Sequence, residues 1–392
     1  MAPTPERKTG GNIILLGFVS LLNDISSEII QPILPLFITA IGGTSLDVGL
    51  IGGISDGLPS ILKVFAGYWS DRIGKRKPLV VGGYGLSAAA KLLLYLSNVW
   101  QQVLLFKIIE RSGKGIRSAP RDAMISESAE KKVRGRGFGL HRAMDSSGAV
   151  IGSALAYLLW RAGLDFRMIF LIAGAFAVVS LIPFIKVRES FKARDSTANL
   201  MLGISNLSPE LRRFLVISSL FAAANFSYMF FILRASQFFT GVLSIGAPLL
   251  LYILFNVFYA AFSLPAGIWS DKVGRKNVLT ICYGLFAAVS LGFAFNTGIY
   301  GLIVLFALYG LVFAMLDGSE KAFVSDMSLP SIRSTSLGIY YGATGLAAVA
   351  SGLIAGALWE QISPSASFLF GAAVAALASL ALWMMRGPEK IL

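Results

Sequence analysis

The sequence contains one cysteine, Cys282, and one histidine, His141, far apart along the chain. A single cysteine excludes an intrachain disulfide, and these two residues form no His/Cys cluster with the spacing of a metal site. The chain also has no Gly-Lys-Ser/Thr loop that would bind phosphate. We therefore expect neither a metal nor a cofactor, and neither an enzyme nor an ATP-driven pump.

Charge is scarce as well. Only 14% of the 392 residues are charged and the mean hydropathy is +0.72, whereas soluble domains carry roughly 25% charged residues. Apolar stretches of about 20 residues, long enough to span a bilayer, recur along the chain. They cover residues 13–40, 46–69, 79–97, 102–125, 138–160, 168–185, 214–240, 246–269, 278–296, 299–322, 335–358 and 366–385. The pattern predicts an all-α integral membrane protein with about twelve transmembrane helices.

The first apolar stretch does not have the features of a cleaved signal peptide. It is too long, it contains Asp24 and Glu28, and no small-residue cleavage site follows it. We expect it to be the first transmembrane helix.

Basic residues outnumber acidic ones by 34 to 21, and they gather in every second connection between the apolar stretches. The connections on the opposite side are short and nearly uncharged. From this positive-inside pattern we expect both termini and residues 186–213 to lie in the cytoplasm. We expect the protein itself to lie in the plasma (inner) membrane. It also accounts for the basic excess without nucleic acid as a partner.

The longest polar segment, residues 186–213, divides the chain into two halves. We expect it to be a cytoplasmic linker between an N-terminal six-helix bundle, residues 1–185, and a C-terminal one, residues 214–392. A shared motif supports the division: Trp-Ser-Asp-basic-aliphatic-Gly-basic-basic begins at Trp69 and again at Trp269. Parallel repeats of this kind occur in transporters.

With this repeated motif, the sequence resembles the major facilitator superfamily, whose loop signature between the second and third helices is matched in both halves. The segments Pro32–Pro35 and Arg111–Gly115 also fit family patterns. The resemblance implies two pseudo-symmetric six-helix bundles with the substrate site between them. Residues 148–152 lack the Gly-Pro pair typical of drug/proton antiporters, which argues against a simple drug-antiporter assignment.

The repeated motif predicts a cytoplasmic gate. Asp71 can sit near the start of the eleventh helix, around Ser334, and Asp271 near the start of the fifth, around Phe138, because a helix N-terminus is partly positive. The alternative is that these are turn residues with anchoring basic residues. The predicted gate comprises Gly67, Asp71, Arg72, Gly74, Lys75, Arg142, Asp145, Gly267, Asp271, Lys272, Gly274 and Arg275.

Ionisable residues within the apolar stretches predict the coupling site, because burying them in a bilayer is costly. Asp24, Glu28 and Gln31 fall within about 60° of one another on the first helix, and Asp24 lies about 16 Å beyond Ile13. The resemblance links Arg111 of the fourth helix to coupling. We expect Asp24 or Glu28, with Arg111, to couple protons or ions, although a structural pair with a neighbouring basic residue is the alternative.

Further polar residues are candidates for the substrate cavity. The fourth helix carries a basic stripe that must line a cavity or a polar helix interface, whereas the C-terminal half offers aromatic and amide side chains. A local ion cluster accounts for Asp317, Glu320 and Lys321. The predicted cavity residues are Gln31, Asp56, Lys107, Glu110, Lys114, Asn225, Tyr228, Arg234, Asn256 and Tyr259.

Together these features predict a monomeric secondary transporter that moves a small organic solute with protons or another ion. Transport would occur by alternating access between the two bundles, with export slightly favoured over import. The basic stripe favours an anionic or zwitterionic solute, and the acids of the first helix favour proton coupling or a cationic group. The alternatives are a lipid or lysolipid flippase on the same fold and a non-transporting membrane receptor or scaffold.

The topology is testable by cysteine labelling. In a Cys282→Ala background, Ser190→Cys should remain unlabelled when an impermeant maleimide is added to intact cells, because residue 190 is expected in the cytoplasm. Ala162→Cys, in an opposite connection, is the matched control and should label. Strong labelling at position 190 in intact cells would reverse the orientation.

Overall fold

A computed structural model describes residues 5–73, 75–128, 134–189, 207–296, 298–329 and 332–385. The protein is an all-helical membrane protein with twelve membrane helices in these described parts, as the sequence predicts. Ten of them are long and apolar enough to cross a bilayer by composition. The two others, α5 (Trp100–Glu127) and α6 (Arg134–Arg161), are set apart by their polar residues.

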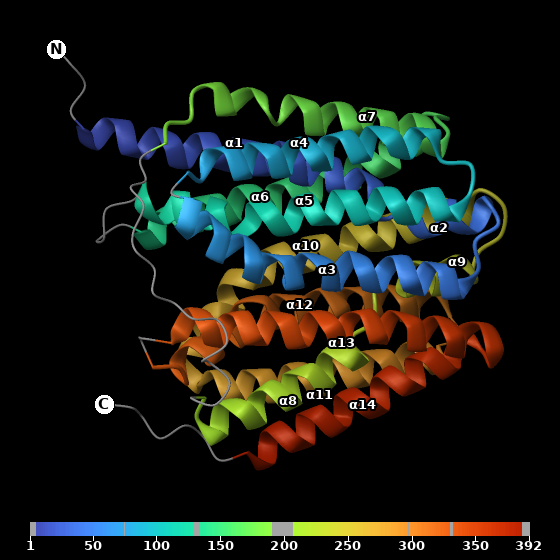
Figure 1. The fold of residues 1–392 in the computed structure, drawn as a ribbon. Coiled ribbons are helices and arrows are strands. Elements are labelled where there is room, and N and C mark those ends of the chain that lie inside the picture. The colour runs from blue at the N-terminus through green and yellow to red at the C-terminus, as the bar shows by residue number, and fades with distance from the viewer. Residues whose placement is uncertain are drawn as a thin grey trace. The chain divides into compact units, whose positions relative to one another are not determined.

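One compact unit comprises residues 1–37 and 58–197. Its helices run side by side, with α1 packed mainly on α6 and α4 on α5 (Figure 1). Leu16 of α1, Tyr84 of α4 and Phe184 share a buried apolar core. Besides α5 and α6, the elements of this unit are α1 (Pro5–Ile30), α4 (Lys77–Leu93), α7 (Phe166–Val179) and the 3-10 turns Leu94–Leu96 and Ile182–Ile185.

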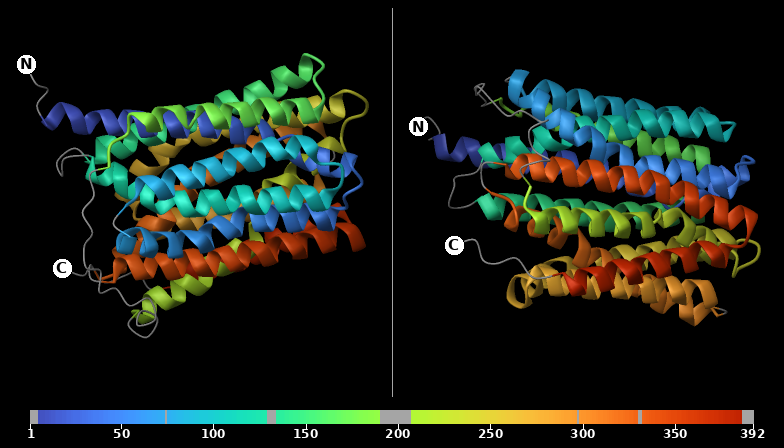
Figure 2. Two further views of the ribbon diagram at one scale, coloured as in Figure 1. Left: turned by 45° about the horizontal axis from the view of Figure 1, so that its top comes forward. Right: turned by 60° about the horizontal axis from the view of Figure 1, so that its bottom comes forward.

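The second compact unit comprises residues 38–57 and 198–392. In it α10 packs on α12 and α11 on α14 (Figure 2). Stacked rings fill its interior, among them Phe231 and Tyr309 at 4.1 Å between centroids. Its helices are α8 (Pro209–Ala224), α9 (Tyr228–Ser236), α10 (Leu243–Val273), α11 (Arg275–Phe295), α12 (Ile299–Asp326), α13 (Arg333–Gln361) and α14 (Pro364–Met384). Because α8 begins at Pro209, the last residues of the predicted linker are helical.

Two membrane helices are interrupted, which corrects the expectation of continuous helices over residues 13–40 and 214–240. The first consists of α1 and α2 (Leu34–Ala40), separated at Gln31, Pro32 and Ile33. Pro32 and Pro35 explain this break, because proline has no N–H to donate and its ring clashes with the preceding turn. The second break, between α8 and α9, contains no proline. There Asn225 leaves helical geometry, with φ −85° and ψ 73°.

Helix α3 (Ser45–Ile73) contributes to both units, and its first half packs on α13. A Cβ atom added to Gly49 would lie 2.2 Å from the carbonyl oxygen of Gly352, and one on Gly57 equally close to that of Gly345. Small residues permit this backbone contact. We call it the glycine seam.

The glycine seam predicts opposite effects of the same substitution at two positions of α13. Gly352→Ala should destabilise the protein by about 1–3 kcal/mol, because the added methyl overpacks the contact. Gly342→Ala should be neutral or stabilising by up to about 1 kcal/mol, because no neighbouring atom obstructs a Cβ there and alanine favours helix. Thermal unfolding in detergent measures both. Equal shifts in the two variants would contradict the packing assignment.

Candidate functional site

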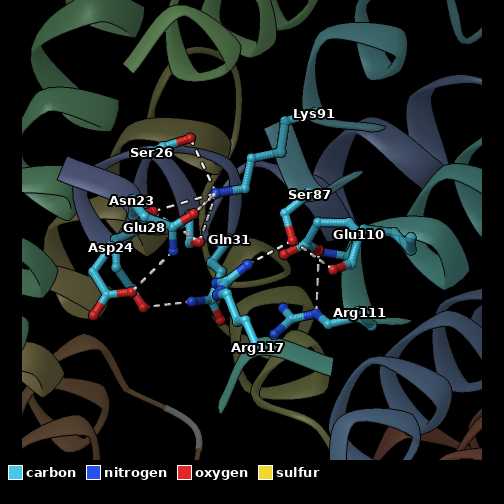
Figure 3. Close-up of polar contacts among 12 residues, drawn as sticks. Asn23, Asp24, Ser26, Glu28, Gln31, Ser87, Lys91, Glu110, Arg111 and Arg117 are labelled. Atoms are coloured by element: carbon cyan, nitrogen blue, oxygen red, sulfur yellow. Dashed lines mark hydrogen bonds and ion pairs between the residues drawn. The ribbon is translucent and has the colours of Figure 1, made fainter. Parts of the chain in front are cut away.

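Polar side chains of α1, α4 and α5 meet inside the unit formed by residues 1–37 and 58–197 (Figure 3). All three helices belong to the membrane-spanning set. Ionisable groups at such depth are costly unless they are paired, so this group of side chains is the candidate functional site. We refer to this group of side chains as the polar network.

On α1, all three residues of the predicted face take part in hydrogen bonds. Gln31 Nε2 donates a hydrogen bond to the Glu28 carboxylate, and Asn23 Nδ2 donates to Asp24 Oδ1 over 3.4 Å. Both carboxylates are half-buried. Gln31 stands at the start of the helix break, so it lies where backbone groups are freed from the helical pattern.

Sequence reasoning missed Lys91, which lies at the centre of the polar network. Its side chain is 1% exposed. Its Nζ donates to the backbone oxygen of Asn23 at 3.2 Å, to Ser26 Oγ at 3.1 Å and to Ser27 Oγ at 2.9 Å. Its bonded partners on α1 are therefore neutral oxygens. The signal was present, because Lys91 is the only charged residue in the apolar stretch 79–97.

The basic stripe of α5 is mostly turned inward. Glu110 Oε2 lies 2.5 Å from Lys107 Nζ and 3.2 Å from Arg111 Nε, and all three side chains are buried. The ion pair described for Arg111 is thus with its own helix. Lys114 differs in being exposed, and Asp24 of α1 is among its electrostatic neighbours.

Arg117 and Arg121 join α5 to α4 and α1. The Arg117 guanidinium lies 4.1 Å from the centroid of the Tyr84 ring, close enough for a cation–π interaction, and its NH1 donates to Ser87 Oγ at 2.6 Å. Arg121 NH1 donates to Ser20 Oγ at 2.9 Å. These contacts hold the three helices of the polar network in register.

At the predicted gate, the described pair on α6 is His141 Nδ1 with Asp145 Oδ2 at 3.4 Å. Arg142, the other predicted gate residue on α6, is exposed. The side chain of Asp71, together with Gly74, Phe138 and Ser334, falls outside what the structure describes of side chains. The predicted contacts of Asp71 and Asp271 with helix starts remain predictions.

The two copies of the repeated motif make similar ion pairs within their own units. Arg76 pairs with Glu127 at the end of α5, and Arg275 NH1 lies 2.6 Å from Asp326 at the end of α12. Gly274, between α10 and α11, has φ 98°, a conformation that favours glycine. Of the other gate residues, Arg72, Lys75 and Lys272 are exposed, and a Cβ on Gly267 would meet no neighbour.

Glu189 stabilises the backbone at the end of the first copy of the repeated motif. Its two carboxylate oxygens accept the backbone N–H groups of Arg76 and Lys77, each at 2.9 Å. A carboxylate at a helix N-terminus is favourable because the first N–H groups have no partner inside the helix. Glu189 therefore caps α4, a role that sequence reasoning did not assign.

The predicted cavity residues of the other unit have varied surroundings. Tyr259 donates to Asp317 Oδ2 at 3.1 Å, and the Tyr228 ring lies 5.6 Å from that of Tyr252. Arg234 Nε donates to the backbone oxygen of Phe293 at 3.3 Å, which anchors it to the end of α11. The remaining three differ in exposure: Asn256 is buried, Asn225 half-buried and Asp56 exposed.

Chemically, the polar network combines half-buried carboxylates with buried lysine and arginine side chains. Such a set can take up or release protons and can hold a charged solute. Among the described residues there is no group of three or more His, Cys, Asp or Glu side chains able to hold a metal ion.

Comparison with known proteins places this geometry in context. The family model described as Major Facilitator Superfamily matches residues 16–258 and 215–391. The chain is 48% identical to the uncharacterized MFS-type transporter MJ1317 of Methanocaldococcus jannaschii, over 96% of this chain and 95% of that protein. It is 23% identical to the multidrug resistance protein MdtH of Aeromonas salmonicida, over 82% and 81% of the two chains. The crystal structure of the nucleoside transporter NupG matches with a TM-score of 0.78 at 14% identity, over 95% of this chain and 98% of that chain.

The buried charges of α5 predict a large stability difference between two neutralising substitutions. Glu110→Gln should lower the free energy of unfolding by about 3–5 kcal/mol, because it leaves Lys107 and Arg111 buried without their countercharge. Asp122→Asn removes the partner of Arg121, but Asp122 is 46% exposed, so the loss should stay below about 1 kcal/mol. Unfolding in mixed detergent micelles measures both. Comparable losses would show that Glu110 is not the essential countercharge.

Proposed function

Because the chain belongs to the major facilitator superfamily, we propose that this transporter is a proton-coupled permease for a small organic solute, with export favoured over import. The observation that carries the proposal is the pair of half-buried carboxylates, Asp24 and Glu28, on the membrane-spanning helix α1. Acidic residues inside membrane-spanning helices are rare, and those that occur commonly have a role in transport.

The charge balance of the polar network indicates the class of solute. Its acids are Asp24, Glu28 and Glu110, and its bases are Lys91, Lys107, Arg111, Lys114 and Arg117. Three negative and five positive groups leave an excess of two positive charges when all are ionised. Arg121 does not change this excess, because it pairs with Asp122. An anionic solute would reduce this excess, and a zwitterionic solute could place its negative group beside these bases, so we propose that the solute carries at least one negative group.

Proton coupling follows because the acids of α1 and an anionic solute compete for the same basic side chains. Asp24 is an electrostatic neighbour of Lys91, Lys114 and Arg117. When Asp24 or Glu28 is protonated, these bases lose a negative partner and attract an anionic solute more strongly. When the acid is ionised, it competes with that solute. Proton and solute thereby acquire different affinities for the states of the cycle, which is the condition for coupling.

The broken helices support a role in solute binding. Gln31 borders the break between α1 and α2, and Asn225 forms the break between α8 and α9. Discontinuous membrane helices at corresponding positions in two repeats are typical of transporter binding sites. We propose that both breaks contact the solute and that the Asp71 and Asp271 motifs act in cytoplasmic closure.

We also propose a direction of transport and a membrane for this protein. Relatives named multidrug resistance proteins support export, although the sequence lacks the Gly-Pro pair of residues expected in drug/proton antiporters. We propose a plasma-membrane protein that works as a monomer with cytoplasmic termini.

The coupling assignment is tested with Asp24→Asn and Glu28→Gln. A thermal-shift screen of anionic and zwitterionic compounds at two pH values first identifies a solute, since a ligand of the native state raises its stability. In proteoliposomes, at least one acid variant should then lose its response to a pH gradient by at least tenfold, because it can no longer exchange a proton.

Lys63 is a half-buried charged residue of helix α3 that belongs to neither the coupling residues nor the cavity residues. Lys63→Ala is therefore the control, and its transport should change less than twofold. Solute-induced stabilisation should persist in at least one acid variant. Normal gradient-driven transport in both acid variants would make these acids structural. Loss of solute binding in both would instead identify them as solute ligands and favour a cationic group on the solute.

A further inference from the structure

The second half of α12 contains Asp317, Glu320 and Lys321, which the sequence presents as one ion cluster. The structure separates them. Lys321 Nζ lies 2.6 Å from Asp317 Oδ1, and both side chains are partly exposed. Glu320 is not in this pair. Its side chain points into the unit interior and is only 7% exposed.

Two tyrosines from two other helices hold the Glu320 carboxyl group. Tyr283 of α11 donates its hydroxyl to Oε1, and Tyr340 of α13 donates to Oε2 at 2.5 Å. Both rings are buried, and Phe221 stacks on Tyr283 with 3.8 Å between centroids. Each carboxyl oxygen is thus bound by a neutral phenol from a different direction.

No basic side chain of the described residues forms an ion pair with Glu320. The charged and titratable groups around it are Asp317 and Lys321 on α12 itself, Tyr283 and Cys282 on α11, and Tyr340 with the adjacent Tyr341 on α13; Tyr259 of α10 reaches Asp317. Lys321 is already paired with Asp317. The nearest full positive charge is therefore largely neutralised before it acts on Glu320.

A carboxylate in this position would be a buried charge without a countercharge, which is costly even when it is hydrogen-bonded. A neutral carboxylic acid avoids that cost and can still accept hydrogen bonds from phenols. We propose that Glu320 is a proton-binding site of the transporter, separate from the acids of α1. The ligand of this site is the proton itself.

The site also links protonation to the packing of three helices. Glu320 belongs to α12, and its partners belong to α11 and α13, so one carboxyl group joins all three. Uptake of a proton replaces an acceptor-only carboxylate by a group that also donates. The hydrogen bonds between the three helices must then rearrange, which gives them different stability in the two protonation states.

Infrared spectroscopy tests the site without any transport assay. Purified protein in lipid at neutral pH should show a carboxylic-acid C=O band that shifts in D2O. Glu320→Gln should remove one band from this region, while the matched control Asp317→Asn should leave it unchanged, because Asp317 is already ionised beside Lys321. An identical wild-type and Glu320→Gln spectrum in this region would overturn the proposal.

Tyr340→Phe provides a second test that retains the carboxyl group. Removing one phenol donor should shift the Glu320 band to higher frequency without abolishing it. If Glu320→Gln does not fold, this variant decides, and an unchanged band would overturn the proposal. Because the readout is a single carboxyl group on α12, it is independent of the outcome for Asp24→Asn and Glu28→Gln.

Discussion

The constraint on which this structure depends is the cost of placing charge in the hydrocarbon interior of a bilayer. Water is not available there to solvate a charged group, so each buried ionisable side chain needs protein partners. Glu110 has two bases, Lys91 has the oxygens of α1, and Arg117 has a tyrosine ring and a serine hydroxyl. The partners of Lys91 and Arg117 come from neighbouring helices, whereas those of Glu110 lie on its own helix. Satisfying Lys91 and Arg117 therefore also fixes which helices of the unit must pack together.

The three environments satisfy charge in different ways, and the differences separate their roles. Around Glu110 two bases of the same helix share one carboxylate, which offsets part of the cost of burying these charges. Around Asp24 and Glu28 the side chains are only half-buried, which is the environment in which we propose that protons and solute bind. Around Glu320 the described hydrogen-bond donors are two neutral phenols, which is why we propose that its carboxyl group changes charge state. Structural, solute-accessible and proton-binding functions can therefore coexist among residues of similar type.

Much of the fold could be predicted from the sequence, because hydropathy and the positions of basic residues depend only on local composition. The twelve helices followed from these features, whereas the repeated motif is read directly from the sequence and the shared face of Asp24, Glu28 and Gln31 is a prediction from helical period. What could not be predicted was contact between helices. Lys91 was overlooked because its partners lie about 65 residues earlier in the chain, and Glu320 was grouped with its sequence neighbours because nothing local indicates Tyr283 and Tyr340. The break at Asn225 contains no proline from which it could have been predicted.

The glycine seam between α3 and α13 has a consequence for how fast these helices can part. Most helix contacts interlock side chains, and each separation and return must restore the correct rotamers at a cost in entropy. The seam presents backbone to backbone, and glycine has no rotamer to restore. Its surfaces can therefore separate and meet again without a search among side-chain conformations, so the rate of such a movement would be set by the helices as whole bodies.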